Sequence, residues 1–93
     1  MATMKIRSEF LTRLKKSLVD DLKGANIQAK VSTEPVPTTL LHRVTVIAAK
    51  FKALKHSERQ SLVWRIAERT LSEDEQLRIS MILTLTRAEA DGK

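Results

Sequence analysis

The sequence predicts a small α+β domain in which two helices cover one face of a three-stranded mixed sheet. Three observations predict this class. Apolar residues recur every three to four positions in two segments, which is typical of amphipathic helices. Apolar and polar residues alternate in three other segments, which is typical of half-buried strands. The order is helix, strand, strand, helix, strand, and 93 residues leave room for a single domain, 1–93.

The first helix is expected from about residue 5 to residue 23. Charged residues occupy the face opposite its apolar stripe, and Gly24 stands where a helix C-cap would lie. The apolar stripe consists of Phe10, Leu11, Leu14, Leu18 and Leu22.

Two strands are expected next, and they can form a hairpin. Ile27, Ala29 and Val31 alternate with polar residues, and Val44 and Val46 do the same within "HRVTVIAA". The segment between them, "TEPVPTT", carries both prolines. Because proline cannot donate a hydrogen bond to a neighbouring strand, this segment is expected to be a loop.

The second helix is expected from Ser57 to about Leu71, after the connector "KFKALKH". Ser57 and Gln60 have the spacing of a capping box, in which each side chain bonds a backbone amide of the other's residue. The acidic stretch "SEDEQ" then predicts a turn, with room for one turn of helix. The side chains expected to be buried on this helix are Leu62, Val63, Ile66 and Ala67.

The last strand shows the clearest alternation of the chain. Because a helix connects it to the second strand, the two strands are expected to be parallel. The stretch "RAEADGK" is expected to be a frayed polar tail, 87–93, which leaves 5–86 as the folded core. The residues expected to face one side of the sheet are Leu77, Ile79, Met81, Leu83 and Leu85.

The composition narrows the classes of function. There is no cysteine, so thiolate chemistry is excluded, and two glycines cannot build a glycine-rich phosphate loop. No nucleophile motif and no pair of catalytic carboxylates stands out. No apolar run is long enough to span a membrane, and the N-terminus lacks the apolar core of a secretory signal. We expect a cytoplasmic protein that is not an enzyme and uses no cofactor and no small-molecule substrate.

The basic residues are the first candidates for binding. A formal net charge of +6 favours polyanions and acidic partners. Arg59 falls within the apolar arc of the second helix, where an arginine is expected to bond nearby backbone carbonyls rather than a ligand. Aromatic residues that could stack on bases are few. The candidates for nucleic-acid contact are Lys50, Lys52, Lys55, Arg59 and Arg65.

A metal site is not expected from the two histidines. His42 and His56 lie at opposite ends of a strand and its connector, too far apart to share one ion. His42 is expected to bond the backbone at the start of its strand, and His56 is expected to face solvent.

Three stretches, in this element order, resemble the BolA family of small proteins with a class II KH-like fold. They are "HRVTVIAAKF", "FKALKHSERQSLV" and "LRISMILTLT". In the second, Phe51, Arg59 and Val63 follow the family pattern. The resemblance runs from about Phe10 to Thr86. It implies an adaptor or regulator that contacts monothiol glutaredoxins, with which BolA-like proteins can share a two-iron two-sulfur cluster.

Three positions depart from the family pattern. The glycine after the phenylalanine is Ala53, the family's Arg-His is Arg59 and Gln60, and the histidine that opens the last strand is Arg78. Arginine has no lone pair to offer a metal. The expectation is therefore an adaptor that docks without supplying the usual cluster histidine. His42, which matches a histidine that opens the family's second strand, is the one weak candidate for a ligand.

The residues that could contact a protein partner are Gln60, Trp64 and Arg78. Trp64 lies at the edge of the buried arc, where it either closes the core or anchors a partner. The alternative to an adaptor is a KH-like protein that binds DNA or another nucleic acid and has no relation to glutaredoxins.

Overall fold

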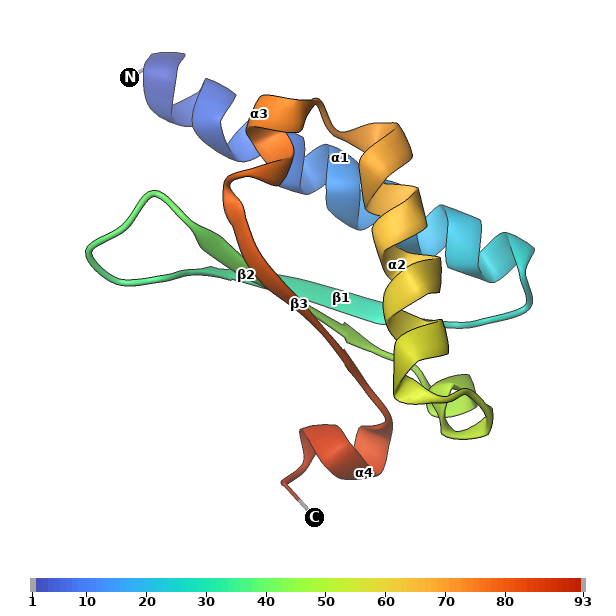
Figure 1. Ribbon diagram of the computed structural model, residues 1–93. Helices are drawn as coiled ribbons and strands as arrows, with labels where there is room; N and C mark the ends of the chain where they lie inside the picture. Colours follow the sequence, from blue (N-terminus) through green and yellow to red (C-terminus); the bar gives the residue numbers. More distant parts are fainter. Residues whose placement is uncertain (1, 93) are drawn as a thin grey trace.

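The computed structural model describes residues 2–92, with side chains described from residue 9 onward. The predicted α+β class and the order helix, strand, strand, helix, strand are confirmed, with three short helices added (Figure 1). The elements are α1 (Ala2–Gly24), β1 (Lys30–Pro35), β2 (His42–Ile47), the 3-10 helix η1 (Ala49–Ala53), α2 (His56–Thr70), α3 (Glu73–Gln76), β3 (Ile79–Leu85) and α4 (Arg87–Ala90).

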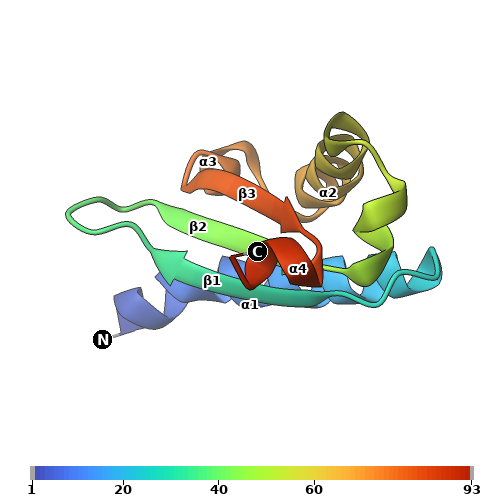
Figure 2. The ribbon, with the colours of Figure 1, turned by 90° about the horizontal axis from the view of Figure 1, so that it is seen from below.

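The sheet has the strand order β1-β2-β3. As predicted, β1 pairs antiparallel with β2, and β2 pairs parallel with β3. Figure 1 shows α1 and α2 above the sheet, and in Figure 2, seen from below, β1 lies in front of α1, so the two long helices lie on one side of the sheet. The short helix α4 lies on the other side, at the end where β3 finishes.

The core lies between the two long helices and the sheet. The predicted stripe of α1 is buried throughout, and it meets buried residues of β2 and α2 such as Val44 and Val63. Phe51 of η1 is the largest side chain with no exposed surface. Among the described residues, no helix is long and apolar enough to cross a membrane.

The predicted alternation of β3 has the wrong phase. Ile79 is buried as expected, but Met81 is 46% exposed and Leu77, which precedes the strand, is 75% exposed. The side chains buried after Ile79 are those of Ile82 and Thr84 instead.

A β-bulge at Ser80 explains this error. Ile79 pairs with His42, but the next pair joins Arg43 to Met81, so Ser80 is an extra residue on β3. An extra residue reverses the alternation beyond it. The three apolar residues after the bulge, Met81, Leu83 and Leu85, therefore share the open face of the sheet rather than the core.

The first strand lies later in the chain than predicted. It begins at Lys30 and runs through Pro35, inside the segment that was expected to be a loop. β1 is an edge strand, and Pro35 is its last residue, a position where the missing N–H is tolerated.

The second helix begins one residue earlier than predicted, and the expected capping box does not form. The Glu58 carboxylate accepts a hydrogen bond from the backbone N–H of Lys55 at 2.7 Å, so Glu58 caps the helix. Gln60 points to the sheet instead. The expected single turn of helix in "SEDEQ" is α3, capped by Ser72.

The tail that was expected to fray forms α4. The Thr86 hydroxyl accepts from the backbone N–H of Glu89, and the Glu89 carboxylate accepts from the backbone N–H of Thr86 at 2.8 Å. This reciprocal capping box stabilises a short helix within a segment that has no apolar stripe.

Candidate functional site: the basic end of the domain

The connector between β2 and α2 presents its lysines around a buried anchor. Phe51 has no exposed surface, whereas Lys50 and Lys52 on either side of it are exposed. Neighbouring side chains of a 3-10 helix point about 120° apart, so a buried residue turns its neighbours outward. Lys55, which follows η1 within the connector, is also exposed.

Arg59 is not part of this exposed set. Its Nε donates to the carbonyl of Leu54 at 3.2 Å, and its Nη1 donates to the carbonyl of Thr84 at 3.2 Å. Nη1 also lies 3.0 Å from the carboxylate of Glu89. The guanidinium carbon lies 5.8 Å from the centre of the Phe51 ring. The expectation that Arg59 bonds backbone carbonyls is confirmed, and its Nε and Nη1 donors are used inside the protein.

Gln60 is also used inside the protein. Its Nε2 donates to the carbonyl of Ile82 at 2.8 Å and to the Thr84 hydroxyl at 3.1 Å. Arg59 and Gln60 thus bond the carbonyls of β3 that point away from β2. A free strand edge invites pairing with another chain, and these two side chains protect it.

The other candidate residues lie apart from the connector lysines. Arg65 is exposed on α2, in a shallow hollow with Ser61 and Leu62. Trp64 is half-buried against the core. Arg78 is half-buried just before β3, and its carbonyl accepts from the backbone N–H of His42 at 2.8 Å.

Three adjoining hollows lie at the end of the sheet where β2 finishes, and Ala49 lines all of them. We call them together the Ala49 groove. The first, of about 510 Å³, lies between the end of α1 and η1 and contains Lys23 and Lys50. Asn26 lines it in a left-handed conformation, with a φ of 69°, which asparagine tolerates better than most residues.

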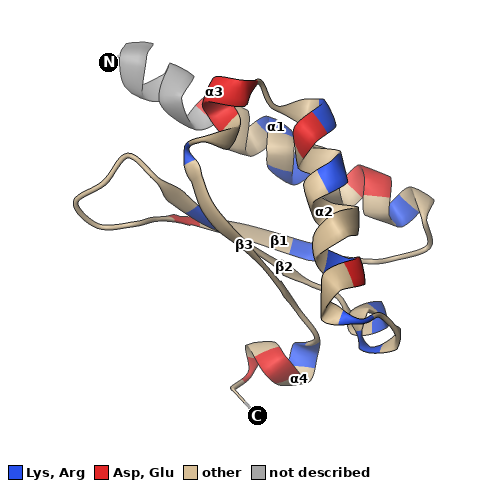
Figure 3. Cartoon of the chain, in the orientation of Figure 1, with Lys and Arg blue, Asp and Glu red and all other residues tan. Residues whose placement is uncertain are grey.

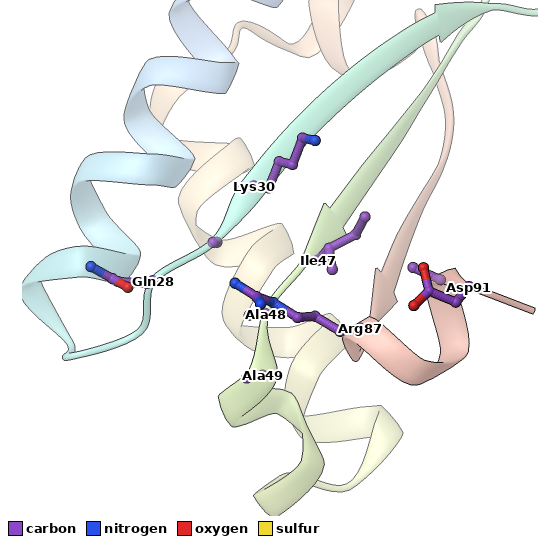
Figure 4. Close-up of a pocket in the computed structure, with 9 residues that line it drawn as sticks. Gln28, Lys30, Ile47, Ala48, Ala49, Arg87 and Asp91 are labelled. Carbon is purple, nitrogen blue, oxygen red and sulfur yellow. The ribbon is translucent and has the colours of Figure 1, made fainter. Parts of the chain in front are cut away.

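The middle hollow, of about 430 Å³, joins β1, β2 and α4. Figure 4 shows Arg87 reaching from α4 toward the end of β2, with Lys30 on β1 and Asp91 at the far end of α4. The third hollow, of about 500 Å³, lies between η1 and α4 and contains Lys52 and the paired Arg59.

The charges at this end are unbalanced. All four ion pairs among the described side chains use arginine, namely Arg13, Arg43, Arg59 and Arg69, and none uses lysine. Figure 3 shows the basic positions of η1, β1 and the start of α2 and α4 at the same end of the molecule. We call this set the basic end. It consists of Lys23, Lys30, Lys50, Lys52, Lys55 and Arg87, none of which has an ion-pair partner within the described part of the chain.

One acid at this end is already neutralised. The backbone N–H of Thr86 and the guanidinium of Arg59 both hold the pKa of Glu89 below its ordinary value. Glu89 is therefore ionised and paired at neutral pH. Among the described residues, Asp91 is the remaining acid that lines the groove.

The two positions where the family resemblance expects a cluster histidine, Gln60 and Arg78, offer no imidazole. Gln60 is bonded to β3, and the Arg78 guanidinium has no lone pair for iron. The His42 ring packs edge-on against Phe10, with 6.0 Å between the ring centres. No group of three or more histidine, cysteine or carboxylate side chains that could hold a metal occurs in the described part of the chain.

Three residues of the basic end were predicted from the sequence, and the other three were not. Lys50, Lys52 and Lys55 stand together in the sequence, whereas Lys23, Lys30 and Arg87 come from three separate segments. They meet only because β1, β2 and α4 finish or begin at the same end of the sheet. No short stretch of the sequence indicates that these residues lie close together.

Comparison with models of known protein families, with curated proteins and with solved structures found no match to this chain.

Proposed function

We propose that this chain is a non-enzymatic, BolA-like adaptor or regulator that docks on a protein partner, with a monothiol glutaredoxin as the partner to test first. It docks without giving the cluster a ligand. The observation that carries this proposal is that the Gln60 side chain is hydrogen-bonded within the protein. At a position where the resemblance expects a histidine, the side chain is bonded to two groups of β3 and serves the fold.

A surface suited to a protein contact lies at the end of the sheet opposite the basic end. Leu40, Leu77 and Met81 are the large apolar side chains that the described part of the chain exposes. Leu40 and Leu77 each stand two residues before the paired His42 and Ile79, and Met81 pairs with Arg43, so all three belong to the end of the sheet where β2 and β3 begin. Arg78 adjoins Leu77. Apolar side chains next to an arginine are typical of the energetic centre of protein interfaces.

The test is a titration of the purified protein with a monothiol glutaredoxin by calorimetry. The double substitution Leu77→Asp/Met81→Asp should weaken binding by about 30-fold, the equivalent of about 2 kcal/mol. The matched control is Thr12→Asp, on the exposed face of α1. No binding by the unaltered protein would refute glutaredoxin as the partner, and equal binding by both variants would remove this surface from the proposal.

A second candidate function is binding of nucleic acid, and the basic end supports it. Six exposed cations without acidic partners supply the charge that releases counterions from a phosphate backbone. Alanine at Lys50, Lys52 and Lys55 should weaken DNA binding equally across sequences and flatten its salt dependence. Gel-shift assays over a range of salt concentrations measure both effects. An unchanged slope of log affinity against log salt would exclude the three lysines from the DNA contact.

A further inference from the structure

The Ala49 groove has the features of a binding site for one kind of ligand. We propose that it binds an extended chain of phosphate groups through charge, without recognition of bases. This inference rests on the second candidate function, because a phosphodiester backbone is one such chain. Inorganic polyphosphate is another source of the same chemistry.

The three hollows of the groove adjoin one another, and each of them is lined by cations. The first and middle hollows share Gln28 and Ala49, and the middle and third hollows share Ala49 and Arg87. Lys23 and Lys50 line the first hollow, Lys30 and Arg87 the middle one, and Lys52 and Arg87 the third. A single phosphate would meet the cations of one hollow only, whereas a chain of phosphates meets cations in all three.

The lining favours phosphate over bases. No aromatic side chain lines any of the three hollows, so bases have no surface on which to stack. Small residues, Ala48, Ala49 and Ala90, are part of the lining of the middle hollow, and their short side chains leave Lys30 and Arg87 accessible to a slender chain.

Removal of an acidic side chain from the groove should strengthen phosphate binding. Glu89 is paired with Arg59, so Asp91 is the unneutralised acid in the lining. Removing its charge with Asp91→Asn should strengthen binding, because a phosphate chain in the middle hollow lies beside it.

The experiment measures fluorescence anisotropy with four labelled probes on the whole protein. The probes are a single-stranded oligothymidylate, an abasic oligonucleotide of equal length, inorganic polyphosphate and poly-glutamate. Binding to the first three is expected, with the oligothymidylate and the abasic strand equal in affinity. With five groove cations engaged, affinity for the single strand should fall by about 100-fold from about 50 to about 200 mM salt.

Matched pairs of substitutions locate the site. Lys30→Ala/Arg87→Ala should flatten the slope of log affinity against log salt by about 1.4, since each cation contributes about 0.7 on a single strand. Lys15→Ala/Lys16→Ala, on the exposed face of α1, removes the same charge and should leave the slope unchanged. Ala49→Glu should abolish binding, because it places a negative charge in the centre of the groove.

Each contrary result overturns a distinct statement. Stronger binding of the oligothymidylate than of the abasic strand would refute the absence of base recognition. Equal binding of poly-glutamate would replace phosphate by an acidic peptide. DNA binding that survives Ala49→Glu and Lys30→Ala/Arg87→Ala would refute the groove but leave the nucleic-acid function in place. The absence of any anion binding at low salt would refute both the groove as a phosphate site and the nucleic-acid function.

Discussion

The guanidinium of Arg59 lies 3.0 Å from the carboxylate of Glu89, and this ion pair joins α2 to α4. The same nitrogen donates to the carbonyl of Thr84 in β3, and Nε donates to the carbonyl of Leu54 at the end of the connector. A single, largely buried side chain therefore holds together the connector, the last strand and the last helix.

Replacement of Arg59 should destabilise the protein strongly. Arg59→Met removes three bonds and leaves the buried Thr84 carbonyl without this donor, so the free energy of unfolding should fall by about 2–3 kcal/mol. Arg59→Lys keeps the charge but loses the planar fork, and should give an intermediate loss. Urea unfolding measures both, with Arg65→Met on exposed α2 surface as a control that changes stability by less than about 0.5 kcal/mol. A loss no larger than that of the control would mean that the Arg59 contacts contribute little.

Gln60 offers a substitution whose cost depends on pH. In Gln60→Glu, the new carboxylate faces the carbonyl of Ile82, which cannot donate to it, so stability at neutral pH should fall by about 1–3 kcal/mol. The charged form is disfavoured in the folded state, which raises the pKa of the new carboxyl. The loss is therefore present at neutral pH and shrinks as the pH falls and the carboxyl gains a proton that it can donate.

The check is urea unfolding of Gln60→Glu and Gln60→Ala at neutral and at mildly acid pH. The difference in stability between the two variants should narrow at acid pH, because the alanine variant has nothing to titrate at this position. A difference that stays constant with pH would contradict the hydrogen bond from Gln60 to β3.

The sequence predicts the parts of this fold that follow local periodicity. The stripe from Phe10 to Leu22 is buried because one helix face repeats without interruption. The sequence does not show which residues of β3 face the core. The bulge at Ser80 arises from the pairing of β3 with β2, and the apolar and polar residues alternate in the same way before and after it. The predicted role of Gln60 is wrong for a similar reason. Ser57 and Gln60 have the spacing of a capping box, but Glu58 caps the helix instead.

The candidate site was predicted only in its contiguous part. Lys50 and Lys52 are exposed because they flank Phe51, and this follows from a few neighbouring residues. Lys30 and Arg87 reach the same groove through the sheet register, a relationship between residues far apart in the chain. In the sequence, Arg59 looks like one more basic residue of the cluster. In the structure its side chain bonds β3 and α4 and does not belong to the exposed set.

Acid should release α4 from the rest of the domain. The folded-state pKa of Glu89 is lowered, first by the backbone N–H of Thr86 and then by Arg59. Its stabilising contribution is therefore fully present above the ordinary pKa of a glutamate and is lost as the pH falls through the lower folded-state value. Glu89→Gln should be less stable than the unaltered protein at neutral pH, and the two stabilities should converge in acid. Parallel pH profiles of the two proteins would show that neither the cap with Thr86 nor the ion pair with Arg59 stabilises the folded state through the Glu89 charge.

His42 should not become a ligand of a glutaredoxin-bound cluster. The His42 ring is half-buried and packs edge-on against Phe10, and its backbone N–H is bonded to Arg78. Turning the ring toward a partner's iron would break the aromatic contact. We therefore expect that mixing the protein with a cluster-loaded monothiol glutaredoxin leaves the visible absorption and circular dichroism of the cluster unchanged, even where calorimetry detects docking. His42→Ala should behave in the same way. A new spectrum typical of mixed histidine and cysteine ligation that disappears in His42→Ala would show that His42 is a ligand and that the ring leaves Phe10 on binding.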